Sequence, residues 1–327
     1  MKMISLTMPS RFLSNIGVEM RTLITAFVII LCLFAPVLGF SSTIVDNSGQ
    51  QVVMDKPFSR IISLYSAHTE NLSSLGVENS IIGISSSDDF PPSILNKPKF
   101  SYREGPEKFI AARPDLVLIR PMIERSYPQL ITKLRQTGIT VVSLQPTSID
   151  GIFEYWRSLG ILTGREQQAE AMITSFKSEL QEIVRIVASI PPQQRKMVYF
   201  EAIHKKMKTF APESIAIFAL EQAGGQNVAA DAPRVRKTNI AFYGKERILA
   251  KSGEIDVFLA QQGRMNPVTI EIIKNEPGFQ ALDAVREEKI FLVDERLVSR
   301  PTMRILDGIR QIGEILYPEF SSSAVVK

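Results

Sequence analysis

Two segments far apart in the chain share one pattern, and this repetition constrains the fold more than any other feature. The first, GPEKFIAARPDLVLIR, runs from Gly105 to Arg120, and the second, GKERILAKSGEIDVFLAQ, from Gly244 to Gln261. Each contains a glycine, a glutamate two positions later, an apolar pair, an alanine, and an acidic residue that leads an apolar run. A length of 327 residues is sufficient for two domains, each large enough to bury its own core. The repetition therefore predicts two similar halves.

Short β-type runs alternate with helical segments in both halves. A hairpin around Ser48-Gly49 opens the first half. Strands are predicted at residues 60–65, 81–84, 116–119 and 139–144, and then at 197–202, 256–260 and 289–294. Strands that alternate with helices form parallel βα units, so the expected fold class is α/β with parallel sheets.

One long amphipathic helix is predicted between the halves, over residues 165–189. Its apolar residues recur every three or four positions and form one stripe, and Pro191 and Pro192 end it. At about 1.5 Å per residue, it is roughly 37 Å long, enough to join two domains. An ordinary surface helix of either half is the alternative. The expected organisation is a signal peptide (1–39), an N-terminal lobe (40–163), an interdomain helix (164–190) and a C-terminal lobe (191–327).

The amino end contains an apolar run from Leu23 to Phe40 that resembles a secretory signal. Small residues precede a cut after Gly39, as such signals require. An uncleaved membrane anchor and a buried helix are the alternatives. Cys32, the one cysteine, follows Leu31, where a lipoprotein signal has a small residue, so a lipid anchor is not expected. The expected location is the periplasm.

The charge balance argues against a nucleic-acid partner. The chain has 38 Lys and Arg against 34 Asp and Glu, and the surplus shrinks further once the first 39 residues are set aside. A nucleic-acid binder needs a concentrated basic excess. An exported enzyme is a further class, but we find no GxGxxG, Walker A, HExxH or GxSxG motif, and no cysteine nucleophile after residue 39. An enzyme is not expected.

Several motifs together resemble those of cluster III periplasmic binding proteins, which serve ATP-driven importers of ferric siderophores, cobalamin and haem. These are HTENLSSLG, EKFIAARPDLVLI, LRQTGITVVSL, LEQAGGQNV, ERILA, FQALDAVREEKIFLVD and RPTMRILDGIRQIGEIL. The resemblance covers about residues 59–319. It implies two Rossmann-like lobes joined by one long helix, with the ligand in a cleft between them. It also implies a monomer without a resident cofactor, and an inner-membrane permease dimer with its ATPase subunits as partner.

The resemblance gives the repeated segment a purpose. In this family each lobe presents a surface glutamate that enters a basic pocket on one permease subunit, and the matching residues here are Glu107 and Glu246. A two-fold permease offers two equivalent sites, which suits two similar acidic residues. Two additional residues separate Glu246 from its strand, which could shift it relative to Glu107. The plain alternative is that each carboxylate only favours the first turn of its helix.

Ligand residues are expected in the loops after the strands, because ligands of open α/β sheets bind beyond the carboxyl ends of the strands. Aromatic and basic side chains predominate there, beside acidic Asp88 and Asp89. The predicted ligand residues are Tyr65, His68, Tyr102, Arg103, Arg120, Arg125, His204, Lys206, Phe242, Tyr243 and Arg300. Basic groups suit an anionic ligand, which favours a ferric siderophore over cobalamin, with haem as a further alternative.

The only two histidines, His68 and His204, follow corresponding first strands of the two halves. They could clamp a haem or cobalt centre from both sides, or be ordinary polar histidines. Two histidines are few for a bare-metal binder, so no metal site is expected. An extracytoplasmic sensor that presents its ligand to a membrane receptor would use the same fold and remains a separate functional class.

Overall fold

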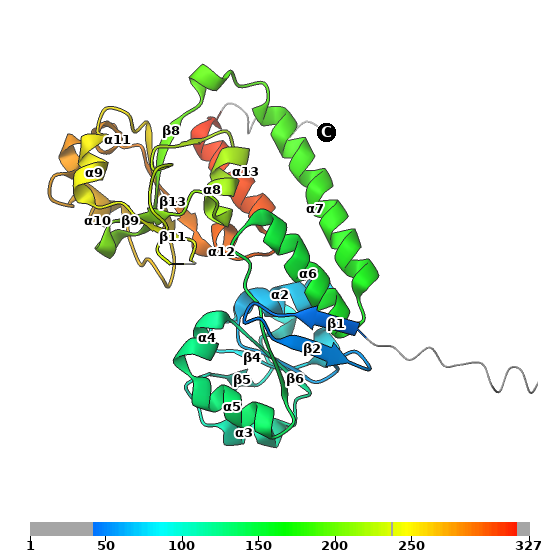
Figure 1. Ribbon diagram of the computed structural model, residues 1–327. Coiled ribbons are helices and arrows are strands. Elements are labelled where there is room, and N and C mark those ends of the chain that lie inside the picture. The colour runs from blue at the N-terminus through cyan, green and yellow to red at the C-terminus, as the bar shows by residue number, and fades with distance from the viewer. Residues whose placement is uncertain (1–41, 237, 319–327) are drawn as a thin grey trace, which may run out of the picture. The chain divides into compact units, whose positions relative to one another are not determined.

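The computed structural model describes residues 42–236 and 238–318. Within these residues there are a two-stranded hairpin and two larger sheets, and helices accompany both of the larger sheets (Figure 1). The predicted signal peptide and Cys32 lie outside the described residues. None of the helices within them is long and apolar enough to cross a membrane.

The first lobe is built on a parallel sheet with strand order β5-β4-β3-β6-β7. Its strands are β3 (Ile61–Ser63), β4 (Ile81–Ser85), β5 (Lys99–Phe100), β6 (Leu116–Ile119) and β7 (Thr140–Ser143). Its helices are α2 (Ser66–Ser74), α3 (Pro106–Ala112), α4 (Pro121–Ser126), α5 (Pro128–Gln136) and α6 (Ile149–Thr163), with 3-10 turns at Glu78–Ser80 and Pro92–Ile94. β6 is buried at every position, as expected for a central parallel strand covered on both faces.

A separate antiparallel hairpin precedes this sheet, formed by β1 (Ser42–Val45) and β2 (Gln51–Met54). Gly49 has φ +80 in its turn, a conformation that favours glycine. The carboxylate of Asp46 accepts hydrogen bonds from the backbone N–H groups of Ser48, Gln50 and Ser143. The predicted hairpin is confirmed, and Asp46 connects it to the end of β7.

The second lobe has a mixed sheet with the order β11-β9-β8-β12-β13, with β10 also paired to β8. Its strands are β8 (Met197–Ile203), β9 (Lys208–Phe210), β10 (Gln226–Asn227), β11 (Ile240–Phe242), β12 (Val257–Gln262) and β13 (Ile290–Asp294). Its helices are α8 (Ile215–Gln222), α9 (Lys245–Ala250), α10 (Ile270–Lys274), α11 (Asp283–Arg286), α12 (Glu295–Val298) and α13 (Ile305–Leu316). Its 3-10 turns are Pro192–Gln194, His204–Lys206 and Phe279–Ala281.

The α/β fold class is confirmed, with one difference in the second lobe. β9 pairs antiparallel with β8, and β11 pairs antiparallel with β9. The sequence predicts no strand at either place, because β9 and β11 are three residues each and carry little periodicity. Met207, with φ +46 after the turn at His204–Lys206, reverses the chain between β8 and β9.

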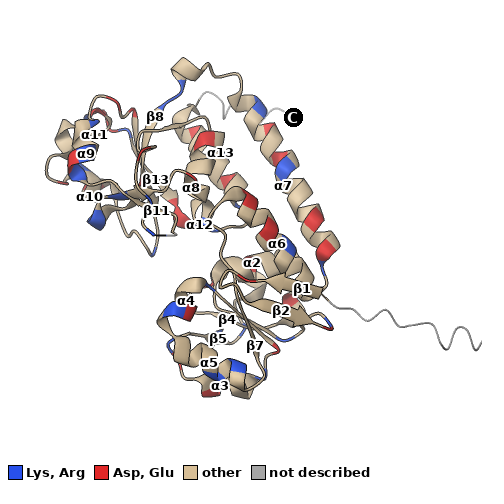
Figure 2. Ribbon diagram, in the orientation of Figure 1, with Lys and Arg blue, Asp and Glu red and all other residues tan. Residues whose placement is uncertain are grey.

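The helix between the lobes is α7 (Glu166–Val187). It packs against α6 of the first lobe and against α13 and α8 of the second. Its buried residues are Ala169, Met172, Ile173, Phe176, Ile183 and Val187, on the predicted apolar stripe. Phe176 is fully buried, with ring centroids 5.5 Å from Trp156 and 5.8 Å from Phe153. Figure 2 shows charged residues of both signs along the remainder of this helix.

Candidate functional site

Tyr65 and Arg120 lie together where two neighbouring strands of the first lobe end. Tyr65 follows β3 as the N-cap residue of α2, and Arg120 follows β6 as the N-cap residue of α4. The guanidinium carbon of Arg120 lies 4.5 Å from the centre of the Tyr65 ring, a cation–π contact. Desolvation raises the pKa of the Tyr65 phenol, against the lowering effect of Arg120 and Arg300. Both side chains are partly exposed, and Arg120 Nε is buried without a hydrogen-bond partner among the described residues.

Arg300 of the second lobe forms a forked ion pair with Asp89 of the first. Its Nη1 donates to Asp89 Oδ1 at 2.6 Å and its Nη2 to Oδ2 at 3.1 Å. Arg296 Nη1 lies 3.7 Å from the same carboxylate. Desolvation opposes ionisation of Asp89, but the hydrogen bond and charge of Arg300 outweigh it and lower the pKa of this carboxyl. We call Tyr65, Arg120, Asp89, Arg296 and Arg300 the interlobe cluster.

The segment after Arg300 is bound to the first lobe by further polar contacts. The carbonyl of Pro301 accepts hydrogen bonds from Asn71 Nδ2 at 2.9 Å and from Trp156 Nε1 at 3.2 Å. Arg304 Nε donates to Glu70 Oε1 at 2.9 Å, and desolvation raises the pKa of Glu70 against the opposing charge of Arg304. Residues 300–304 therefore connect the second lobe to α2 and α6 through charged and neutral hydrogen bonds.

His68 does not suit the predicted contact with a ligand, because it is fully buried. Its Nε2 donates to the carbonyl of Ile119 at 3.1 Å, which leaves Nδ1 to accept from the hydroxyl of Tyr155 at 2.7 Å. Burial lowers the pKa of this imidazole to about 3. The ring is therefore neutral, and both of its nitrogens are bonded within the first lobe.

His204 is also buried and engaged within its own lobe. Its Nδ1 lies 3.0 Å from the buried carboxylate of Glu201, and its Nε2 lies 3.5 Å from Glu276, which also pairs with Lys245. Desolvation acts to lower the pKa of His204, but Glu201 and Glu276 raise it overall. Both histidines are thus buried and bonded within their own lobes, so this arrangement favours ordinary polar histidines over the bis-imidazole clamp. Within the described part of the chain, no group of three or more His, Cys, Asp or Glu is arranged to hold a metal ion.

Tyr243 is another predicted ligand residue that the structure places in the core. It is buried, its ring centroid lies 5.6 Å from that of Tyr199, and the guanidinium of Arg247 covers it at 4.3 Å. Phe242, one position earlier, is 56% exposed and lies 4.4 Å from the Lys208 ammonium group. Phe242 is the last residue of β11, whereas Tyr243 lies between that strand and α9, and the two rings have different surroundings.

The remaining predicted ligand residues lie on the surface, outside the interlobe cluster. Tyr102 packs against Tyr127 with ring centroids 4.9 Å apart, and Arg103 lies 5.8 Å from the centre of the Tyr102 ring. Arg125 and Lys206 are exposed. Of the predicted set, Tyr65 and Arg120 are in contact, and Arg300 lies near enough for its charge to lower the pKa of Tyr65. Asp89 and Arg296 complete the cluster. In the sequence, only their positions shortly after the predicted strands at 81–84 and 289–294 indicate that they could lie near a ligand.

Glu107 and Glu246 occupy equivalent positions in their helices. Each is exposed and is the second residue of its helix, after an N-cap glycine, in α3 and α9 respectively. Gly244 has φ +89, whereas Gly105 has φ −67 and is followed by proline. The backbone before the helix therefore differs between the two lobes, but the carboxylate occupies the same position of the helix in both. Neither carboxylate has an ion-pair partner in the part of the chain that the structure describes.

Comparisons with known proteins give consistent results. A sequence profile described as periplasmic binding protein matches residues 61–297. The ABC transporter substrate-binding lipoprotein YvrC of Bacillus subtilis is 25% identical over 283 residues, which are 86% of this chain and 87% of that protein. The vitamin B12-binding protein of Vibrio cholerae is 24% identical over 264 residues, 80% of this chain and 90% of that protein.

A solved structure from Staphylococcus epidermidis resembles the chain in fold and sequence. It is described as a possible iron-binding (periplasmic solute-binding) protein. Its TM-score is 0.70 at 29% sequence identity, and the match covers 80% of this chain and all of that one.

Proposed function

As a member of the periplasmic binding protein family, cluster III, this chain is an ABC-type substrate-binding protein, and we propose that it captures a ferric siderophore-type chelate at the interlobe cluster. Its relatives are solute-binding proteins rather than enzymes. The proposal includes export to the periplasm and delivery of the chelate to an inner-membrane permease.

The observation that carries the ligand proposal is the concentration of guanidinium groups at the strand ends. Arg120, Arg296 and Arg300 come from both lobes, and Arg120 Nε has no protein partner among the described residues. Guanidinium groups form forked, charge-assisted hydrogen bonds with oxygen-rich anions. The ring of Tyr65 under Arg120 adds a flat surface suited to a catecholate.

Cobalamin is the second candidate, because a 24% identical relative is a vitamin B12-binding protein. Cobalamin is largely neutral apart from its phosphate, so it would use little of the positive charge at the cluster. Haem, with two propionates, would use part of it.

Titration of the purified protein with a ferric catecholate and, separately, with cyanocobalamin distinguishes these ligands. Trp156 is the only tryptophan and donates to Pro301, so its emission reports on the connection between the lobes. We expect saturable quenching by the ferric catecholate. Arg300→Met should weaken that binding about 10- to 100-fold, the contribution of one charge-assisted hydrogen bond. Arg125→Met, an exposed arginine outside the cluster, is the matched control.

A response to cyanocobalamin alone would refute the iron-chelate proposal and leave the importer class intact. Weakening by Arg125→Met equal to that by Arg300→Met would show that general positive charge, rather than the cluster, attracts the ligand.

Docking to the permease is proposed for Glu107 and Glu246. Replacing both with glutamine should abolish substrate-dependent uptake while leaving ligand affinity unchanged, because both lie outside the interlobe cluster. Glu271→Gln is the matched control, since Glu271 is also an exposed first-turn glutamate, in α10. Unchanged uptake in the double variant would contradict the docking proposal, and signalling without uptake would favour the sensor.

A further inference from the structure

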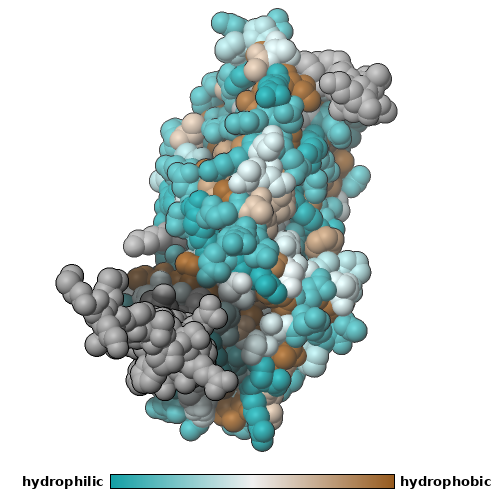
Figure 3. Space-filling model, turned by 90° about the vertical axis from the view of Figure 1, so that its right-hand side faces the viewer, coloured by the Kyte–Doolittle hydropathy of each residue, from teal (hydrophilic) through white to brown (hydrophobic). Residues whose placement is uncertain are grey.

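A chain of four ionisable groups leads from the core of the second lobe to α9, the helix of the proposed docking residue Glu246. Glu201 in β8 is fully buried, and its carboxylate lies 3.0 Å from His204 Nδ1. His204 Nε2 lies 3.5 Å from Glu276, which also pairs with Lys245. Hydrophilic side chains predominate on the molecular face that Figure 3 shows, the usual environment of charged groups. A fully buried carboxylate at the end of such a chain is unusual, and we call the four side chains the α9 network.

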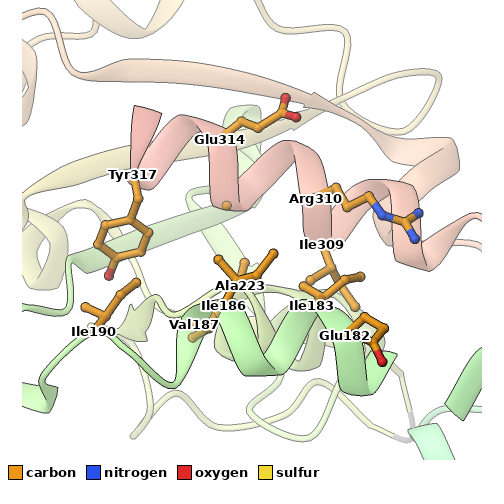
Figure 4. Close-up of a pocket in the computed structure, with 11 residues that line it drawn as sticks. Glu182, Ile183, Ile186, Val187, Ile190, Ala223, Ile309, Arg310, Glu314 and Tyr317 are labelled. Carbon is orange, nitrogen blue, oxygen red and sulfur yellow. The ribbon is translucent and has the colours of Figure 1, made fainter. Parts of the chain in front are cut away.

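Apolar packing holds the helices of the second lobe to very different extents. α13 has six buried residues and packs against α7 around an apolar groove of about 210 Å³, where Ile183 and Val187 face Ile309 (Figure 4). α9 has one buried residue, Ile248, and Leu249 is partly buried. Apolar contacts are non-directional, so these two side chains restrain the orientation of a six-residue helix only weakly. A directional contact is needed to fix its first turn.

Lys245 supplies a directional contact at that turn. It is the first residue of α9 and directly precedes Glu246. Its ammonium group pairs with Glu276 and donates to the carbonyl of Pro277 at 3.2 Å. Glu276 in turn lies beside His204, the residue that follows β8. The first turn of α9 is thereby connected to the end of the central strand of the second sheet.

The ion pair of Lys245 is better shielded from solvent than an ordinary surface pair. Exposed pairs contribute little, because water screens them and both side chains lose conformational freedom. The side chains of Lys245 and Glu276 are 30% and 19% exposed. Glu201 and Glu276 raise the pKa of His204, which favours a positive imidazolium between the two carboxylates. Glu276 is thus held between two cationic groups.

The first lobe has a different residue at the matching position. α3 begins with Pro106, between Gly105 and Glu107. A proline ring fixes φ near −65°, which suits the first helical position and needs no side-chain contact. Lys245 has no such ring, and Gly244 before it has φ +89. The two lobes therefore begin these helices by different means, a proline ring in one and an ion pair in the other.

We propose that Lys245 is a positioning residue for Glu246, because its ion pair with Glu276 fixes the first turn of α9 and thereby the direction in which the Glu246 carboxylate is presented to the permease. This inference rests on the proposed docking function of Glu246. It gives the α9 network the role that Pro106 has in the first lobe.

Hydrogen–deuterium exchange of the full chain tests the tether without a permease. The amides of residues 248–250 are measured, because the N–H of Ile248 donates to the carbonyl of Gly244 within this turn. Lys245→Met should speed their exchange about 10-fold, the effect of one charge-assisted hydrogen bond. Lys245→Pro should restore slow exchange without the charge, since the first residue of a helix needs no N–H. Lys289→Met, which removes a lysine paired with Glu287 elsewhere in the lobe, is the matched control and should leave exchange unchanged.

Uptake of a ferric catecholate, by cells that express each variant as their only binding protein, tests the consequence for docking. Lys245→Met should lower the rate of uptake about 10-fold and leave the affinity for the catecholate unchanged, because Lys245 lies outside the interlobe cluster. Lys245→Pro should recover uptake, a result that loss of a positive charge alone does not explain.

Unchanged exchange at residues 248–250 in Lys245→Met would overturn the proposal, whatever the uptake of that variant. Faster exchange with unchanged uptake would also overturn it, provided that the double variant Glu107→Gln, Glu246→Gln loses uptake in the same cells. Retained uptake in that double variant would instead refute the docking function itself, and the positioning role of Lys245 with it.

Discussion

The two histidines should shift the stability of the protein in opposite directions as the pH falls. His68 is buried and neutral, with its pKa lowered to about 3 by desolvation. The unfolded chain therefore carries a proton on His68 between pH 3 and its ordinary value of 6.5, where the folded chain does not. Because the unfolded state binds more protons in that window, the free energy of unfolding decreases as the pH is lowered through it.

The size of this effect follows from the displacement of the pKa. One pH unit within the window changes the free energy of unfolding by about 1.4 kcal/mol per group. Lowering the pH from 7.5 to 5 crosses about 1.5 units below the unfolded value of 6.5, so His68 alone should cost roughly 2 kcal/mol.

His204 contributes with the opposite sign. Glu201 and Glu276 raise its pKa, so its stabilising contribution is complete below pH 6.5 and is lost as the pH rises through the folded value. The measurement therefore compares His204→Gln with the double variant His68→Gln, His204→Gln. Urea unfolding followed by far-ultraviolet circular dichroism at pH 7.5 and pH 5 gives the free energy of unfolding of both.

The loss between the two pH values should be about 2 kcal/mol larger for His204→Gln than for the double variant. The carboxylates titrate in both proteins, and a constant cost of His68→Gln cancels because only the difference between pH values is used. An equal loss in the two proteins would refute the assignment of His68 as a buried neutral imidazole.

Two further predictions concern packing and charge. Phe176→Ala should lower the free energy of unfolding by about 3–5 kcal/mol, because Phe176 is fully buried and its ring contacts those of Trp156 and Phe153. The control Ser178→Ala, at an exposed position of the same helix, should change it by less than about 0.5 kcal/mol. Urea unfolding of both variants measures these changes, and a loss below about 1 kcal/mol for Phe176→Ala would contradict the prediction. Asp89→Asn should strengthen binding of a ferric catecholate several-fold, because the Asp89 carboxylate competes with an anionic ligand for Arg300. Titration followed by tryptophan fluorescence measures this. Weaker binding would contradict the prediction and indicate that Asp89 positions Arg300 for the ligand.

The sequence predicted those parts of the fold that depend on local periodicity. The strands β4, β6 and β13 and the helix α7 lie within one or two residues of their predicted ranges, because each carries a clear apolar run or stripe. Glu107 and Glu246 could also be placed, since a glycine two positions before a glutamate marks a helix start in both lobes.

The pairing of side chains across the lobes could not be predicted in the same way. Glu70 lies in α2, where seven consecutive residues are buried although most of them are polar, so no apolar stripe in the sequence indicates that this helix is covered on several sides. His68 and Tyr243 are polar or amphipathic residue types next to strand ends, and their type does not reveal which way they point. The ion pair between Asp89 and Arg300 joins residues more than two hundred positions apart, and no local pattern encodes that contact.

The contacts between the lobes bear on the proposed capture of a ligand at the interlobe cluster. Arg300 can bind an anion only by sharing or exchanging its forked contact with Asp89, and it directly precedes Pro301, whose carbonyl is bonded to Asn71 and Trp156. Each neutral hydrogen bond contributes about 0.5–1.5 kcal/mol, so together they oppose displacement of the segment. An anion that replaces Asp89 removes one interlobe contact while leaving those at Pro301 in place. Exchange at Arg300 would therefore require only a local change, and we expect α7 and the contacts of Pro301 to limit the movement of Glu107 relative to Glu246 when ligand binds.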